Sequence, residues 1–312
     1  MSYFSIDVGG FICYDESQFI LLGGFMTKYI ITTESGSDLK QDVIDRYDVR
    51  IVPMHVTMGD KTYIDGSFPV TKAFDYYKES GQLPKTSGST PQDNTEVFQQ
   101  IFADYPDAQI IHIGYSAVTT VSFNAARIAS EEFKAGKIHL VDSKNVTLGL
   151  ASIVEETAEY IEANPTVTPA EIIAFVEDIR ERVRFIFLPK TLVYLHAGGR
   201  VSNMAFHGAN LLNLHPTIKV EDGYLKSDKK YRGSFERCLK KTIDDFFKRY
   251  DIDPETIRVG GSPGVTTELK DLAYSLVAEH GATNPGAWFD TGTVISSHGG
   301  PEAFGMVGIE RP

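Results

Sequence analysis

The chain has 312 residues, of which 42% are hydrophobic and 23% are charged, and its formal net charge is -12. This length allows a large core and favours two domains, and the composition is ordinary for a globular protein. The negative net charge argues against general binding to nucleic acid or to an anionic membrane. No apolar run approaches the roughly 20 residues that a membrane-spanning helix needs.

The first 25 residues differ in character from the rest of the chain. They contain no lysine or arginine, and no small-residue cleavage site follows their apolar patch, so they do not resemble a signal peptide. Met26 opens a convincing first strand, and we interpret residues 1–25 as an extension outside the fold. The two cysteines, Cys13 and Cys238, have neither disulfide-framework nor metal-site spacing, which favours a cytoplasmic protein.

Short apolar runs alternate with amphipathic stretches along the rest of the chain. The predicted strands are residues 29–32, 50–56, 109–113, 138–141, 184–187, 217–220, 256–259 and 306–309. The predicted helices are residues 92–102, 122–133, 153–162, 169–182, 235–249 and 268–280. This alternation predicts an α/β fold with βαβ units and a largely parallel sheet. The pair Gly59-Asp60 additionally predicts a local hairpin.

A domain boundary is expected near residues 165–170, where a segment with two prolines interrupts two predicted helices. Thr168 before Pro169, with Glu171 close behind, is typical of a helix cap and first turn. We therefore predict an N-terminal α/β domain at residues 26–167 and a C-terminal α/β domain at residues 168–312.

Three hydroxyl-rich segments, residues 86–91, 116–120 and 295–305, are the candidates for a binding site. In the third, His298 is flanked by serines and glycines, which offer neutral donors and a closely approachable backbone. Ligands of open α/β sheets bind at the carboxyl ends of strands, and the segments around Ser116 and His298 each follow an apolar run. We expect the three to converge into a pocket for a small anion. Alternatively they are ordinary turns, and His298 is a structural histidine.

Other chemistries are less well supported. Gly114-Tyr115-Ser116-Ala117-Val118 begins like the G-x-S-x-G nucleophile elbow, but Val118 stands where that motif needs glycine. A serine esterase or acyltransferase that uses Ser116 and His298 is the alternative function. The glycine-rich loop at residues 260–264 could hold a phosphate at a helix N-terminus, although such loops are common strand-to-helix turns. The eight histidines show no metal-ligand spacing, so no metal site is expected.

Six short segments stand in an order that is itself informative. Thr33-Glu34-Ser35-Gly36-Ser37-Asp38-Leu39 matches the pattern T-D-S-T-A-D-L, and Val52-Pro53-Met54 with Tyr63-Ile64-Asp65 matches V-P-L followed by Y-x-D. Thr86-Ser87 matches the start of T-S-x-P-S, and Val141-Asp142-Ser143 matches V-D-S. Gly198-Gly199-Arg200-Val201 matches G-G-R-[IV], and the segment from His298 to Gly305 is similar to H-x-G-P-G-A-x-G. These patterns are those of the DegV family, which the chain resembles from Thr33 to Gly305. Characterised members of that family are the fatty-acid-binding subunit (FakB) of a bacterial fatty acid kinase.

The resemblance implies two α/β domains with a ligand tunnel between them or at their edge, occupied by a long-chain fatty acid. It implies a carboxylate site made of Thr86, Ser87, Ser116, Thr119, His298 and Gly299. It further implies a binding subunit with no cofactor and no catalysis of its own. A separate kinase subunit (FakA-like) then phosphorylates the carboxylate to an acyl-phosphate for phospholipid synthesis, and Arg200 and Arg232 dock that subunit.

The chain departs from the family pattern near the expected site. The segment from Gly114 to Val121 replaces I-S-S-x-L-S-G-T and loses one serine and the glycine. The proline of the T-S loop is absent from its usual place and is expected at Pro91 instead. Glu302 replaces a glycine close to His298.

Overall fold

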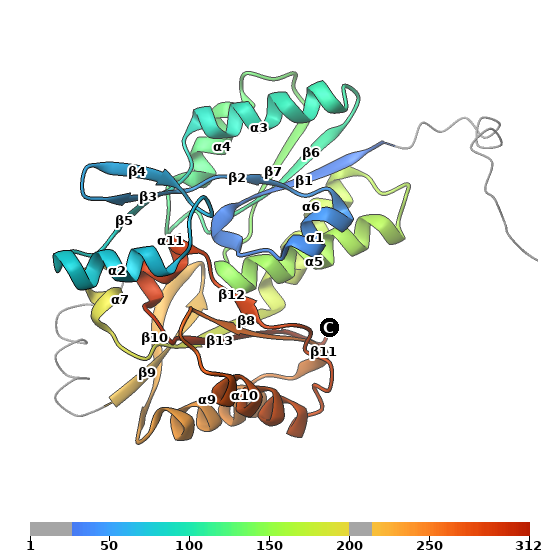
Figure 1. The fold of residues 1–312 in the computed structure, drawn as a ribbon. Coiled ribbons are helices and arrows are strands. Elements are labelled where there is room, and N and C mark those ends of the chain that lie inside the picture. Colours follow the sequence, from blue (N-terminus) through green and yellow to red (C-terminus); the bar gives the residue numbers. More distant parts are fainter. Residues whose placement is uncertain (1–26, 200–213) are drawn as a thin grey trace, which may run out of the picture.

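The computed structural model describes residues 27–199 and 214–312 (Figure 1). The extension predicted at residues 1–25 and the docking residue Arg200 lie outside the described residues. The described chain forms a mixed α/β fold with three sheets and helices packed on them. This agrees with the predicted α/β class.

The first sheet is parallel, as the βαβ alternation predicts. Its strand order is β2-β1-β6-β7, with parallel pairing throughout. The strands are β1 (Tyr29–Glu34), β2 (Arg50–Val52), β6 (Gln109–Gly114) and β7 (Ile138–Asp142). Helices α1 (Gln41–Tyr47), α4 (Ser122–Ser130) and α5 (Thr147–Ala163) follow β1, β6 and β7, and α3 (Pro91–Asp104) precedes β6.

A small antiparallel sheet is inserted between β2 and α3. It consists of β3 (His55–Met58), β4 (Lys61–Ile64) and β5 (Lys85–Ser87), and α2 (Thr71–Ser80) connects the last two. The hairpin predicted at Gly59 is confirmed, and Gly59 has a φ of +60° there. The single strand predicted at residues 50–56 is wrong. It divides at Pro53 into β2 and β3, which belong to different sheets, because proline has no N–H for a continuous ladder.

The third sheet has six strands in the order β10-β9-β8-β13-β11-β12. They are β8 (Val183–Leu188), β9 (Leu214–Glu221), β10 (Tyr224–Arg232), β11 (Ile252–Gly261), β12 (Phe289–Asp290) and β13 (Phe304–Glu310). Only β11 and β12 pair in parallel, so the prediction of a largely parallel sheet is wrong here. For β9 and β10 the physical reason is local, because Asp222 and Gly223 both have positive φ and make a tight turn that sends β10 back along β9. The other antiparallel pairs join strands that are not linked by a tight turn.

The helices form three layers around the two large sheets (Figure 1). Helices α3 and α4 cover the outer face of the parallel sheet, and α9 (Phe235–Arg249) and α10 (Thr267–Glu279) cover the outer face of the antiparallel one. Between the sheets lie α5 and α6 (Pro169–Arg182), in one hydrophobic cluster with side chains of both sheets. The cap predicted at Thr168 is confirmed by its reciprocal hydrogen bonds with Glu171. The domain division at residues 167 and 168 stays a prediction.

Two short helices complete the fold near the expected site. Helix α7 (Val193–Ala197) follows β8, and α11 (Thr293–Gly299) follows β12. His298 therefore follows a strand, as expected, but it lies in the last turn of a helix, and the prediction of a turn or loop there is wrong. Helix α11 packs against α2, α7, β3 and β5, so tertiary contacts hold this short segment in place.

Candidate functional site

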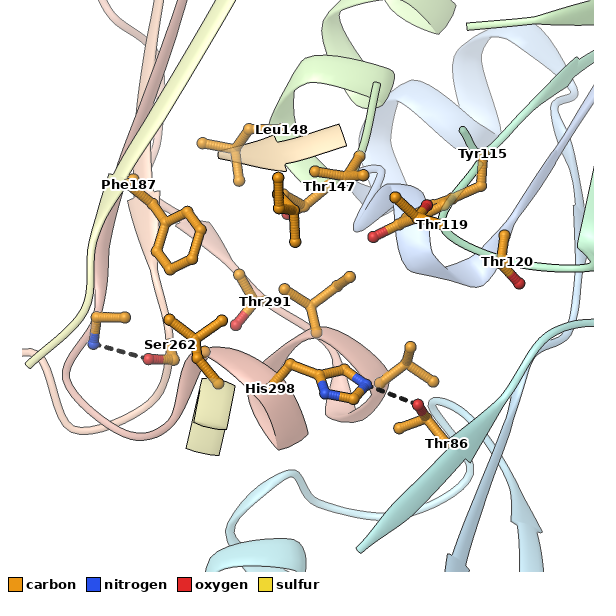
Figure 2. A pocket seen from close by; sticks show the side chains of 18 of the residues that line it. Thr86, Tyr115, Thr119, Thr120, Thr147, Leu148, Phe187, Ser262, Thr291 and His298 are labelled. Atoms are coloured by element: carbon orange, nitrogen blue, oxygen red, sulfur yellow. Dashed lines mark hydrogen bonds between the residues drawn. The ribbon is translucent and has the colours of Figure 1, made fainter. Parts of the chain in front are cut away.

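A cavity lies where elements of all three sheets meet (Figure 2). Its volume is about 310 Å³, at the lower end of the range of about 300–1,000 Å³ that is usual for small-molecule sites. The lining comes from β5, the loop after β6, the start of α5, strands β8, β11 and β13, and helix α11. Among the described residues, none that lines the cavity is an aspartate, glutamate, lysine or arginine.

One end of the cavity is polar. Thr86 of β5 and His298 of α11 face each other there, and a hydrogen bond of 2.7 Å joins Oγ1 of Thr86 to Nε2 of His298. Thr119 and Thr120 lie on the same side of the cavity in Figure 2. The hydroxyl of Thr119 donates to the carbonyl oxygen of Ser116 at 2.9 Å, which leaves its oxygen lone pairs for another donor.

The other end is mainly apolar, although Ser262 and Thr147 also lie on that side of the cavity (Figure 2). Phe187 and Leu148 lie across the cavity from Thr86 (Figure 2), and Phe185, Leu225 and Phe304 line it as well. The cavity therefore combines an uncharged set of hydroxyl and imidazole groups with a hydrophobic interior. Such a cavity suits a molecule with a long apolar part and one small polar head.

The structure brings most of the predicted site residues together. Thr86, Ser87, Thr119, His298 and Gly299 all line the cavity. Their roles as carboxylate ligands stay predictions.

Ser116 was expected to line the cavity, but it is not among the lining residues. It is fully buried, and its hydroxyl donates to the carbonyl oxygen of Gly223 at 2.8 Å, in the turn between β9 and β10. The hydrogen-bond partner that the structure gives Nε2 of His298 is Thr86 instead. This geometry gives no support to an esterase that uses Ser116 and His298, since a nucleophile and its base need to lie within hydrogen-bond reach.

Of two further predicted regions, Arg232 lies apart from the cavity lining and the loop at residues 260–264 forms part of it. Arg232 is exposed at the end of β10, which is an edge strand of its sheet. The loop at residues 260–264 contributes Gly261 and Ser262 to the cavity, where Oγ of Ser262 accepts a hydrogen bond of 2.8 Å from the N–H of Ala303. This loop therefore supports the cavity wall.

Sequence reasoning missed the packing of Gly198 against His298. A Cβ atom at position 198 would overlap Nδ1 of the imidazole, so only glycine allows α7 to approach this ring so closely. Gly198 is the first residue of the G-G-R motif, but the sequence interpretation assigned a role only to the arginine of that motif.

Two aspartates near the cavity, the half-buried Asp38 and the buried Asp65, were also missed as site residues. Asp38 follows the short 3-10 helix Ser35–Ser37, and Asp65 follows β4. Both carboxylates accept hydrogen bonds from backbone N–H groups at the start of α11, the helix that carries His298. The D of T-D-S-T-A-D-L and the D of Y-x-D mark these positions in the sequence.

The stability of the protein is expected to depend on the protonation of Asp38. Burial raises the pKa of its carboxyl from 3.8 to about 8, against the lowering effect of hydrogen bonds from Thr147 and Gly292. Between these two pH values the folded protein binds a proton that the unfolded chain has lost. This group's stabilising contribution is therefore complete below about pH 4 and is lost as the pH rises through about 8.

The substitution Asp38→Asn should remove this pH dependence, because asparagine keeps an acceptor for Gly292 and does not ionise. The free energy of unfolding of the variant, relative to the unmodified protein, should increase as the pH rises from about 5 to about 8. Urea denaturation over that range measures the effect, with the exposed Asp60→Asn as control. If the free energy of unfolding changes with pH in the same way in all three proteins, the pH dependence does not come from Asp38.

The fold and the cavity define a class of α/β protein with an uncharged amphipathic site enclosed where its sheets meet. Residues 28–311 match the family model described as "Uncharacterised protein, DegV family". A DegV domain-containing protein of Caldanaerobacter subterraneus is 30% identical over 92% of this chain and 100% of its own length. The chain belongs to the DegV family.

Solved structures show the same fold. A DegV family protein from Thermus thermophilus, described by its fatty acid binding, superposes with a TM-score of 0.81 at 25% identity, over 91% of this chain and 100% of its own. The fatty acid kinase B3 protein of Streptococcus pneumoniae, loaded with linoleic acid, superposes with a TM-score of 0.76 at 17% identity, over 91% of this chain and 100% of its own. No helix within the described ranges is both long and apolar enough to cross a membrane.

Proposed function

We propose that this protein binds a long-chain fatty acid and presents its carboxylate to a separate kinase subunit. The kinase phosphorylates the carboxylate to an acyl-phosphate, which supplies phospholipid synthesis, and this chain serves as the binding subunit. The observation that carries the proposal is the amphipathic cavity, with Thr86 and His298 joined at its polar end. The fatty-acid-binding relative from Thermus thermophilus supports it.

The acyl tail supplies most of the affinity. Burying one methylene group yields about 0.8 kcal/mol, so about 14 such groups supply on the order of 10 kcal/mol before the cost of immobilisation. The apolar end of the cavity, with Phe185, Phe187 and Phe304, offers the surface against which such a tail packs.

The head group needs only enough donors to satisfy a carboxylate. When Nε2 of His298 donates to Oγ1 of Thr86, the hydroxyl of Thr86 is available to donate to a carboxylate oxygen. A tight ion pair with lysine or arginine would instead reduce the reactivity of that oxygen toward a phosphoryl group. Neutral donors therefore suit a carboxylate that is held first and phosphorylated later.

The kinase subunit is proposed to dock on basic residues, of which Arg200 and Arg232 are the candidates. Arg232 is exposed, as such a role requires, and Arg200 lies outside the described residues. A fatty acid kinase partner is consistent with the relative from Streptococcus pneumoniae, whose description names that kinase.

Mass spectrometry of the protein purified from bacteria tests the proposal. We expect a long-chain fatty acid to be released on denaturation, in an amount close to that of the protein, because tail burial makes dissociation slow. A ligand-free preparation that also fails to bind added oleate or palmitate would contradict it. Labelling of Ser116 by a fluorophosphonate, absent in Ser116→Ala, would favour the esterase alternative.

A further inference from the structure

The N-terminus of α11 is held by the carboxyl groups of two aspartates from earlier parts of the chain. Oδ1 of Asp65 accepts hydrogen bonds from the N–H groups of Thr293 at 3.0 Å and Val294 at 3.2 Å. Oδ1 of Asp38 accepts one from the N–H of Gly292 at 2.7 Å. These are donors that the helix itself leaves without intrahelical partners, so side chains from outside must satisfy them.

The second oxygen of each carboxyl group also accepts a hydrogen bond, in both cases from a hydroxyl group. Oδ2 of Asp65 accepts from the hydroxyl of Ser35 at 2.8 Å, and Oγ of Ser35 accepts from the N–H of Met54 at 3.1 Å. Oδ2 of Asp38 accepts from the hydroxyl of Thr147 at 2.5 Å. The carboxylates thus have oriented partners on both oxygens, and they cannot turn without losing several hydrogen bonds in a buried place.

Gly292 allows the two acids to approach the same point. A Cβ atom at position 292 would lie 3.0 Å from Oδ1 of Asp38 and 3.6 Å from either carboxylate oxygen of Asp65. A side chain there would press on the Asp38 carboxylate. The glycine, the two acids and the first turn of α11 therefore form one closely fitted unit.

The small sheet contacts α11 at both of its ends. Asp65 follows β4, and its N–H is bonded to the carbonyl oxygen of Met54 at 2.9 Å, just before β3. Thr86 lies on β5, where it pairs with Val56 of the same β3 and meets His298 through its hydroxyl. A seven-residue helix is only about 10 Å long, so a shift at its first turn reaches His298 directly.

We propose that Asp65, assisted by Asp38, is a positioning residue for the head-group site. The two carboxylates set the place and direction of α11 relative to the small sheet, so that Nε2 of His298 meets Oγ1 of Thr86. This inference rests on the proposed function for its meaning in ligand recognition, while the positioning itself is a property of the protein without ligand. Asp65 is not among the residues that line the cavity, so we infer that it acts through His298.

The experiment compares Asp65→Ala and Asp65→Asn with Asp60→Asn, which removes an exposed carboxylate from the β3–β4 turn of the same sheet. The first readout is the imidazole ¹⁵N signals of His298 in the ligand-free protein, assigned with His298→Ala. We expect Asp65→Ala to shift these signals, Asp65→Asn to shift them less, and Asp60→Asn to leave them unchanged. Asparagine keeps one oxygen for the α11 N–H groups but loses the charge that favours a helix N-terminus.

The second readout is the ratio of the dissociation constants for oleyl alcohol and oleate. These ligands share a tail, so their ratio reports the head group alone. The unmodified protein should prefer oleate by about tenfold or more, and Asp65→Ala should reduce that ratio several-fold, because a misplaced His298 no longer orients Thr86.

The outcomes separate positioning from simple stabilisation. A lower melting temperature with unchanged His298 signals and an unchanged ligand ratio would overturn the proposal, since Asp65 would then only stabilise the fold. If Asp65→Ala does not fold, the same two readouts on Asp65→Asn decide. If the unmodified protein binds no oleate, the proposed function fails, while the His298 signals still establish or refute the positioning role.

Discussion

His298→Ala is expected to reduce acyl-phosphate formation by about 10- to 100-fold while the protein still folds and still binds the acyl tail. The substitution removes the partner of Thr86 at the polar end of the cavity, so the hydroxyl that faces the carboxylate loses its orientation. Hydrogen bonds to charged groups contribute about 1.5–3 kcal/mol, which corresponds to this range of rates. Hydroxamate trapping of the acyl-phosphate, with ATP and the partner kinase, measures the effect.

Thr86→Val should act in the same direction, because valine has nearly the shape of threonine but no hydroxyl. The matched control is Thr57→Val on β3, whose hydroxyl bonds to that of Thr62 on an exposed face of the same small sheet. Binding of oleate, measured by displacement of a fluorescent fatty acid, should change much less than transfer in His298→Ala and Thr86→Val, and neither quantity should change in Thr57→Val. Undiminished transfer by His298→Ala would remove His298 from the site.

Gly305→Leu is expected to shift the preference of the protein toward shorter acyl chains. Gly305 lies in β13 and lines the cavity, and a Cβ there would lie at ordinary contact distances of 3.5 Å from Phe185 and 3.7 Å from Phe187. Leucine thus adds volume to the apolar end without evident backbone strain. If it displaces two or three methylene groups of a long tail, the loss is about 2 kcal/mol, or about 30-fold in the dissociation constant.

A series of saturated acids of about 10 to about 18 carbons tests this expectation by competition. The loss should grow with chain length and should be small for the shortest acids, while Gly305→Ala, whose added methyl group fits, should behave nearly as the unmodified protein. An equal loss at every chain length would show that the substitution disturbs the head-group site or the fold instead of the tail.

Much of the fold follows from local sequence. Apolar runs predict the strands of the parallel sheet, and Thr168, Pro169 and Glu171 correctly predict the start of α6. The antiparallel order of the last sheet does not follow, because β13 inserts between β8 and β11, and no local pattern tells which strands become neighbours. Helix α11 was missed for a related reason: its short run of threonine, serine and glycine has low helix propensity, and distant groups hold it.

The site could be predicted from the sequence where its side chains have the chemistry that a polar ligand group needs. Hydroxyls and an imidazole at Thr86, Thr119 and His298 attract attention in the sequence, and the structure places them around one cavity. Ser116 has the same chemistry, yet its hydroxyl is bonded to a carbonyl 107 residues away, which no spacing in the chain reveals. Asp38 and Asp65 were missed because the partners that link them to α11 are backbone amides, which every residue but proline carries.

The position of α5 and α6 between the two large sheets limits how a ligand reaches the interior. Leu148, Leu150, Ile153 and Val154 of α5 are all buried in the cluster that joins the sheets. Exposing four such side chains to water costs about 6–12 kcal/mol. Separating the two large sheets therefore costs far more free energy than moving a few side chains at the cavity rim, and we expect the ligand to enter by the smaller movement.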